Sequence, residues 1–199
     1  MYLITDRNQT GGRLLTDVVK EALDGGVKAV QLREKDLPIR ELLKLAEEMR
    51  KITKEAGAML FINGRIDVAM AVEADGIHLG QTDLPVDIVR KIVGNRFMIG
   101  VSTHNLIEAK EAEKEGADFI TFGPVYETPS KLKYGKPVGV EALKRVKSGV
   151  SIPVYAIGGI KSGNIEAILT SGADGVALIS AIIGAREPKK AAEKRIRSI

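Results

Sequence analysis

The sequence contains no cysteine and no tryptophan, and it has only two histidines, His78 and His104. The absence of cysteine excludes disulfide bonds, thiolate metal sites and a cysteine nucleophile. No apolar run approaches the ~20 residues that a membrane-spanning helix needs. The chain begins directly with the strand-like residues 2–5, so we expect no signal peptide. These absences predict a soluble, cytoplasmic protein.

The sequence also lacks a block of charge of one sign. Its 199 residues carry 30 lysines and arginines against 26 aspartates and glutamates, a net charge of +4. Because the basic residues alternate with acids, we expect no nucleic-acid or membrane partner, and anionic small molecules explain the basic balance more easily. The length predicts one domain spanning residues 1–199. The sequence is compatible with a homodimer.

Short apolar runs alternate with helical patterns along the whole chain. The apolar runs predict eight strands, at residues 2–5, 28–33, 59–62, 76–79, 97–101, 118–122, 152–157 and 175–179. The periodic segments predict helices at 12–24, 38–56, 67–72, 86–93, 106–115, 140–146, 162–171 and 188–197. Strands that are apolar throughout are buried on both faces, which is typical of a parallel sheet with helical crossovers.

Eight strand–helix units predict an α/β protein, a single-domain (β/α)8 TIM barrel. A doubly wound open sheet is the alternative, although the first turn lacks the Gly-x-Gly-x-x-Gly pattern of that fold. An internal repeat supports the division into units. Its copies share a small residue or an acid at a helix end, then a turn, then a buried strand. They are 25–30, 74–77, 116–120 and 172–176.

In such a barrel, chemistry gathers where the strands run into the loops that follow them. Gln31, Arg33 and Lys35 alternate in the sequence, so an extended chain would direct all three donors to one side. Two cations and an amide on one side suit a pyrophosphate or another dense anion. Asp83 suits Mg²⁺, but an aspartate before Leu84-Pro85 is equally typical of a helix start. His104 suits a general acid or base, or a residue of a helix cap.

The double glycine Gly158-Gly159 follows the seventh predicted strand directly. Glycines allow the backbone to approach a ligand closely, and a neighbouring helix N-terminus favours a phosphate. A plain tight turn is the alternative. Lys131 lies in a long loop between the sixth strand and its helix, and a loop of this length is typical of a functional lid.

Together these segments resemble the thiamine phosphate synthase family and the related thiazole tautomerases. The resemblance rests on residues 2–6, 31–35, 76–81, 100–104, 123–125, 128–131, 156–160 and 179–180, in that order. It implies a barrel that joins a hydroxymethylpyrimidine pyrophosphate to a thiazole phosphate and releases pyrophosphate. The chemistry implied is dissociative: pyrophosphate leaves, and the thiazole nitrogen captures the pyrimidine cation.

The resemblance also implies the roles of individual residues. The pyrimidine pyrophosphate would be held by Gln31, Arg33, Lys35, Asn63, Ser102 and Lys131. The thiazole phosphate would be held by Thr128, Ser130, Gly159, Ile179 and Ser180, and Leu32, Glu34 and Pro129 would also contact substrate. Arg33, Lys35 and Lys131 would be catalytic, because they neutralise the leaving group together with Mg²⁺ on Asp83.

One position departs from the family pattern. The synthases have an Asn-Asp pair after the third strand, and its aspartate binds magnesium, whereas this chain has Asn63-Gly64. The metal would then need water, substrate or another acid such as Asp67. Two alternatives to a synthase follow. One is a thiazole tautomerase that uses His104 as its catalytic residue, and the other is a non-catalytic paralogue that binds thiazole phosphate.

Overall fold

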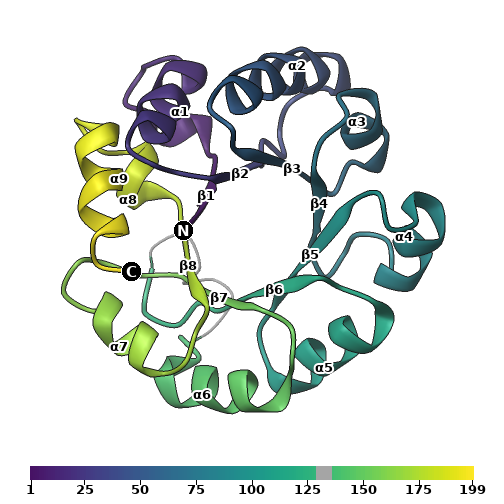
Figure 1. Ribbon diagram of the computed structural model, residues 1–199, viewed down its shortest axis with the longest axis vertical. Helices are drawn as coiled ribbons and strands as arrows, with labels where there is room; N and C mark the ends of the chain where they lie inside the picture. The colour runs from purple at the N-terminus through teal and green to yellow at the C-terminus, as the bar shows by residue number, and fades with distance from the viewer. Residues whose placement is uncertain (129–135) are drawn as a thin grey trace. The chain divides into compact units, whose positions relative to one another are not determined.

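The structure, a computed structural model, describes residues 1–128 and 136–199. Within them eight parallel strands follow one another in chain order in a closed barrel, and helices alternate with the strands (Figure 1). The prediction of an α/β protein with a (β/α)8 barrel is therefore confirmed, and the open sheet is wrong. In the described part of the chain, every helix is too short or too polar to cross a membrane.

The chain divides into two compact units, each described here by itself. Unit 1 comprises Met1–His78 and Leu178–Arg197. Its elements are β1 (Tyr2–Ile4), η1 (Arg7–Gln9), α1 (Leu15–Asp24), β2 (Ala29–Leu32), α2 (Ile39–Glu55), β3 (Met59–Asn63), α3 (Ile66–Ala71), most of β4 (Gly76–Leu79), α8 (Ser180–Ile183) and α9 (Pro188–Ile196). In Figure 1 the helices α1 and α9 lie side by side.

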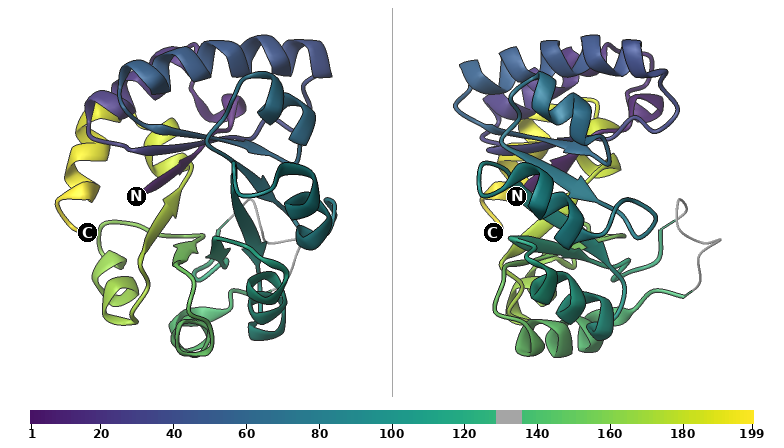
Figure 2. Two further views of the ribbon diagram at one scale, coloured as in Figure 1. Left: turned by 45° about the vertical axis from the view of Figure 1, so that its right-hand side comes forward. Right: turned by 90° about the vertical axis from the view of Figure 1, so that its right-hand side faces the viewer.

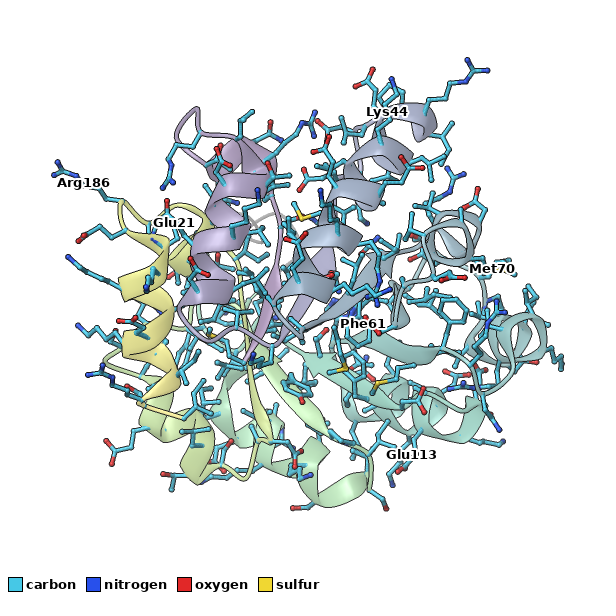
Figure 3. The ribbon with its side chains drawn as sticks, turned by 45° about the horizontal axis from the view of Figure 1, so that its top comes forward. Glu21, Lys44, Phe61, Met70, Glu113 and Arg186 are labelled. Carbon is cyan, nitrogen blue, oxygen red and sulfur yellow. The ribbon has the colours of Figure 1, made fainter. Side chains whose placement is uncertain are left out.

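The core of unit 1 follows from its apolar strands. Val30 on β2 pairs with Leu3 on β1 and with Leu60 on β3, and all three residues are fully buried. The long helix α2 lies across the outside of these strands (Figure 2). Figure 3 shows Lys44 projecting away from α2, whereas Phe61 on β3 lies in the interior. The amphipathic period of α2 and the apolar run of β3 therefore produce the layers that the sequence predicts.

Unit 2 comprises Leu79–Ala177 and Ser198–Ile199. Its elements are α4 (Val86–Val93), β5 (Met98–Thr103), α5 (Leu106–Glu115), β6 (Phe119–Phe122), α6 (Gly139–Gly149), β7 (Val154–Ile157), α7 (Ile165–Thr170) and most of β8 (Gly175–Leu178). Ile120 on β6 pairs with Val101 on β5 and with Val154 on β7, and these side chains are buried. The strands of unit 2 thus repeat the packing of unit 1.

The internal repeat has a structural cause, which is an aspartate at the entrance to an even-numbered strand. Asp75, Asp118 and Asp174 each accept two hydrogen bonds on one carboxylate oxygen. One comes from a backbone N–H at the start of the preceding strand and the other from a cation on the helix before that strand. The amide donors are Leu60, Ile99 and Val154, at 2.7, 2.6 and 2.8 Å, and the cations are Arg50, Arg90 and Lys147.

The first copy of the repeat is the exception. Lys28 stands where the other copies have the aspartate, and its Nζ donates to the carbonyl of Ala56 at 3.1 Å instead. The repeated pattern in the other three copies therefore reflects stability at the amino ends of the strands.

We expect Asp118→Ala to lower the free energy of unfolding by about 2 kcal/mol, because the Ile99 N–H and Arg90 lose a charged acceptor. Urea denaturation of the purified variant measures this change. Asp87→Ala is the matched control, since Asp87 forms an exposed pair with Lys91 on α4 and its removal should leave stability almost unchanged. Equal effects of the two substitutions would contradict the role given to the aspartate.

Candidate active site

The segment after β2 carries the cations predicted to bind a pyrophosphate. The strand ends at Leu32, so Arg33 and Lys35 lie in the loop that follows and not on the strand itself. Arg33 is half-buried, Lys35 is exposed and Glu34 between them is buried. The two cations are therefore both more accessible than the residue between them.

Gln31 belongs to a buried polar cluster inside unit 1. Its Nε2 donates to the Tyr2 hydroxyl at 3.0 Å, and that hydroxyl lies 3.4 Å from Nδ1 of His78. The ring of Tyr2 also meets the edge of Phe61, with centroids 5.4 Å apart. These contacts fix the Gln31 amide with its nitrogen toward Tyr2. The sequence interpretation missed the part played by Tyr2, because only the pairing of β1 with β2 brings it to Gln31.

His78 is fully buried, and it is held neutral. Burial, together with a smaller effect of the positive charge on Arg33, lowers the pKa of His78 to about 3. A neutral imidazole can accept a hydrogen bond from the Tyr2 hydroxyl, whereas an imidazolium would need to donate at both nitrogens. The neutral form therefore suits the cluster that holds Gln31.

The loop after β3 begins with the departure from the family pattern. Asn63 ends β3 and is half-buried, and Gly64 follows with a φ of 66°. The N–H of Gly64 donates to the carbonyl of His78 at 2.9 Å, which ties this turn to β4. Asp67, the acid suggested as a substitute metal ligand, is exposed and both of its oxygens accept hydrogen bonds from Arg65. That pairing lowers the pKa of Asp67, and it makes Asp67 a poor substitute.

Unit 2 contributes Asp83 and Ser102 at the ends of neighbouring segments. Asp83 is half-buried, and its Oδ2 accepts the backbone N–H of Gly80 at 2.7 Å. Gln81 donates from Nε2 to the carbonyl of Ser102 at 2.6 Å, so the loop after β4 is joined to the end of β5. In residues 1–128 and 136–199, no three histidine, aspartate or glutamate side chains gather in a way that could hold a metal ion.

His104 lies at the start of α5, where it takes part in a helix cap. Asn105 is the N-cap residue and accepts from the N–H of Glu108 at 2.9 Å. The Glu108 carboxylate in turn accepts the backbone N–H of His104 at 2.8 Å and lies 3.0 Å from its Nδ1. This arrangement is a variant of the capping box, in which the Glu108 carboxylate reaches back to the N–H of the residue before the N-cap. The capping alternative for His104 thus has direct support in the structure.

The Gly158-Gly159 turn is packed against the segment after β6. Both glycines have positive φ, 96° and 65°. A Cβ added at Gly158 would lie 2.5 Å from Pro124, and one at Gly159 would lie 2.5 Å from the carbonyl of Glu127. The glycines are therefore required by backbone conformation and by contact with the protein itself, whether or not a phosphate also binds there.

The remaining predicted ligands lie on either side of this turn in the sequence. Thr128 is half-buried, whereas Pro129, Ser130 and Lys131 lie outside the described residues. Ile179 is the N-cap of α8, and Ser180 is its first residue. The helix α7 begins only at Ile165, so backbone N–H groups near Gly159 belong to the turn and not to that helix.

Comparison with known proteins decides the family. The model of the family described as "Thiamine monophosphate synthase" matches residues 1–182. The chain belongs to this family. It is 55% identical over 192 residues to a putative thiamine-phosphate synthase of Geobacter sulfurreducens, covering 96% of this chain and 90% of that protein. It is 44% identical over 199 residues to the thiamine-phosphate synthase of Moorella thermoacetica, covering 100% and 94%.

A solved structure agrees with the fold. The thiamine phosphate pyrophosphorylase from Pyrococcus furiosus has a TM-score of 0.90 and 40% sequence identity, covering 98% of this chain and 93% of that one. The resemblance that rested on short segments of the sequence is therefore confirmed over nearly the whole chain.

Proposed function

We propose that the protein is a thiamine phosphate synthase, which joins a hydroxymethylpyrimidine pyrophosphate to a thiazole phosphate. Membership of the thiamine monophosphate synthase family carries this proposal, together with relatives named as synthases. Tautomerase activity is not favoured, since the relatives compared are named as synthases and His104 is engaged in a helix cap. Both substrates are charged small molecules, which fits a cytoplasmic protein that acts without nucleic acid or membrane.

The cations after β2 are the groups that we assign to the pyrophosphate. Arg33 and Lys35 are accessible, while the residue between them is buried. When the bond from the pyrimidine methylene carbon to pyrophosphate oxygen breaks, pyrophosphate takes the electron pair and gains charge. The two cations stabilise that charge. The thiazole nitrogen then supplies its own electron pair to the methylene carbon, so the step requires no protein base.

The buried amide of Gln31 would bind the pyrimidine ring, with Asn63 and Ser102 as further ligands. Thr128, Ser130, Gly159, Ile179 and Ser180 would bind the thiazole phosphate, and Lys131 would assist the leaving group. These assignments extend the family resemblance to the positions of this chain.

Magnesium would be held by Asp83, whose second oxygen remains for the ion when Oδ2 accepts the Gly80 N–H. Mg²⁺ usually takes one or two carboxylates and completes its shell with water and substrate phosphates, so a single aspartate fits this ion. When bound, it would neutralise charge on the pyrophosphate.

The experiment that tests the proposed function measures synthase and tautomerase turnover in parallel, on the wild-type protein and on His104→Ala. We expect the wild type to form thiamine phosphate and His104→Ala to retain most of that rate, since no protein base is needed. A general base in a tautomerase would contribute about 10²–10⁴-fold. Tautomerase turnover that His104→Ala abolishes, without synthase turnover, would overturn the proposal.

A second expected result concerns Gly64. If one carboxylate holds the metal, Gly64→Asp should lower the magnesium concentration needed for half-maximal turnover, because it adds a second carboxylate. The positive φ of 66° costs aspartate less than most residues, so folding should survive. Gly64→Asn is the matched control, since asparagine has the same shape without the charge. A magnesium dependence that is the same in both variants would contradict the placement of the metal.

A further inference from the structure

Glu34 is a buried carboxylate in the middle of the anion-binding segment. Its side chain is only 1% exposed, although both sequence neighbours are more accessible cations. A carboxylate in this place would repel a pyrophosphate if it faced the ligand. It faces the protein instead, where Oε1 accepts the Thr5 hydroxyl at 2.6 Å and both oxygens accept the backbone N–H of Arg7 at 3.1–3.2 Å. Glu34 therefore serves contacts inside unit 1.

The Thr5 hydroxyl continues this arrangement to the backbone of Arg33. Because its single proton is donated to Glu34, its oxygen is oriented to accept, and it receives the N–H of Arg33 at 2.9 Å. Thr5 is itself 0% exposed, and its own N–H donates to the carbonyl of Gln31 at 2.9 Å. A chain of hydrogen bonds thus runs from the Arg33 amide through Thr5 to Glu34, and Thr5 also holds Gln31.

Arg7 pairs with both acids of the loop, Glu34 and Asp36, and holds the far side of the loop. Its guanidinium bonds both oxygens of Asp36, at 2.5 and 2.8 Å, and reaches Glu34 at 3.4 Å. The hydrogen bond from Arg7 holds the pKa of Asp36 below its ordinary value. Both carboxylates that alternate with Arg33 and Lys35 are thus bonded to the guanidinium of Arg7.

We propose that Thr5 and Glu34 are positioning residues, which fix the backbone of residues 33–35 so that the Arg33 and Lys35 side chains are held ready for a pyrophosphate group. This inference rests on the proposed function. It gives Glu34 a different part from the direct substrate contact that the sequence motif implies. Neither Thr5 nor Glu34 then needs to touch the substrate.

The test compares Thr5→Val, which removes the hydroxyl and keeps the shape, with Thr5→Ser, which restores the hydroxyl. We expect Thr5→Val to raise the KM for the pyrimidine pyrophosphate about tenfold, because displaced cations bind it less well. The KM for thiazole phosphate should stay near the wild-type value, and Thr5→Ser should recover most of the lost affinity. Calorimetry should show that the wild type and Thr5→Ser bind inorganic pyrophosphate more tightly than Thr5→Val does. Amide exchange should show faster opening at Arg33 in Thr5→Val.

Two further variants separate positioning from other causes. Thr53→Val removes a different fully buried hydroxyl, one that bonds the Arg50 carbonyl on α2, and should leave both KM values unchanged. Glu34→Gln should raise the same KM as Thr5→Val, and the double variant should add little, since both act through one chain of contacts. If Glu34 touched the substrate directly, Glu34→Gln would raise the KM for the pyrimidine pyrophosphate and Thr5→Val would not. Should Thr5→Val not fold, Thr5→Ala removes the same hydroxyl.

The outcomes distinguish this inference from the proposed function. Wild-type turnover with an unchanged KM in folded Thr5→Val would overturn the positioning and leave the function standing. A wild-type protein that binds pyrophosphate without turnover, and loses that binding in Thr5→Val, would overturn the function and support the positioning. A wild-type protein that neither turns over nor binds pyrophosphate would overturn both.

Discussion

Arg33→Ala should lower kcat/KM for the pyrimidine pyrophosphate by about 10²–10³-fold, the range found when one group that stabilises developing charge is removed. Arg33 lies directly after β2, and its backbone N–H donates to the Thr5 hydroxyl, which fixes the position of the main chain from which the guanidinium extends. Arg33→Lys should recover part of the loss, since an ammonium keeps the charge but lacks the planar fork that binds two phosphate oxygens.

Steady-state kinetics with each substrate varied in turn measures this effect. Arg40→Ala is the matched control, because Arg40 is an exposed arginine in the first turn of α2 and should leave kcat/KM unchanged. If Arg33→Ala lowered kcat/KM for the thiazole phosphate and left kcat/KM for the pyrimidine pyrophosphate unchanged, the assignment of the anion site would be wrong.

The second large effect concerns stability in acid. The folded pKa of His78, about 3, lies below its ordinary value of 6.5, so the unfolded chain binds the proton more readily. The stabilisation from this group is fully present above pH 6.5 and is lost as the pH falls toward 3. Between pH 7 and pH 5 we expect His78 alone to lower the free energy of unfolding by about 2 kcal/mol.

Urea denaturation between pH 7 and pH 5 measures how the free energy of unfolding changes with pH. The two histidines of the chain provide the comparison. His78→Gln stays neutral, so its stability should change much less from pH 7 to pH 5, even if it starts from a lower value. His104→Gln is the comparison variant, because it removes the other histidine of the chain, which is exposed at the start of α5. A slope that His78→Gln leaves unaltered would show that this histidine is not held neutral in the fold.

The strands could be predicted because each is a short apolar run that lies between helices in the barrel. Ala29–Leu32 and Gly175–Leu178 are examples, and their burial on both faces leaves a clear pattern in the sequence. The repeated aspartates were visible as a pattern, but their purpose was not. Asp118 bonds Arg90, which lies 28 positions away, and such pairs are created only by the fold.

The sequence predicted which kinds of side chain the site contains better than it predicted what each side chain does. The sequence placed Gln31, Arg33 and Lys35 together, and the structure keeps the two cations accessible while it buries the amide. It also grouped Glu34 with the ligands. Only the approach of β1 to β2 brings Thr5 and Arg7 to the Glu34 carboxylate and reveals its contacts inside the protein.

The double glycine shows how a local pattern can have more than one cause. The sequence of Gly158-Gly159 suggests room for a phosphate, since glycine permits close approach, with a plain tight turn as the alternative. The structure adds positive φ values and close contacts with the segment after β6. These requirements depend on a neighbouring strand and its loop, so they could not be derived from the two glycines alone.

The most direct measurement of the central claim is the stoichiometry of the products, with the purified protein, both substrates and Mg²⁺. Thiamine phosphate and pyrophosphate should form together in a ratio of one to one. When the thiazole phosphate is left out, neither product should form at the rate seen with both substrates. Binding of thiazole phosphate without either product, at any magnesium concentration, would contradict the assignment of this chain as a synthase.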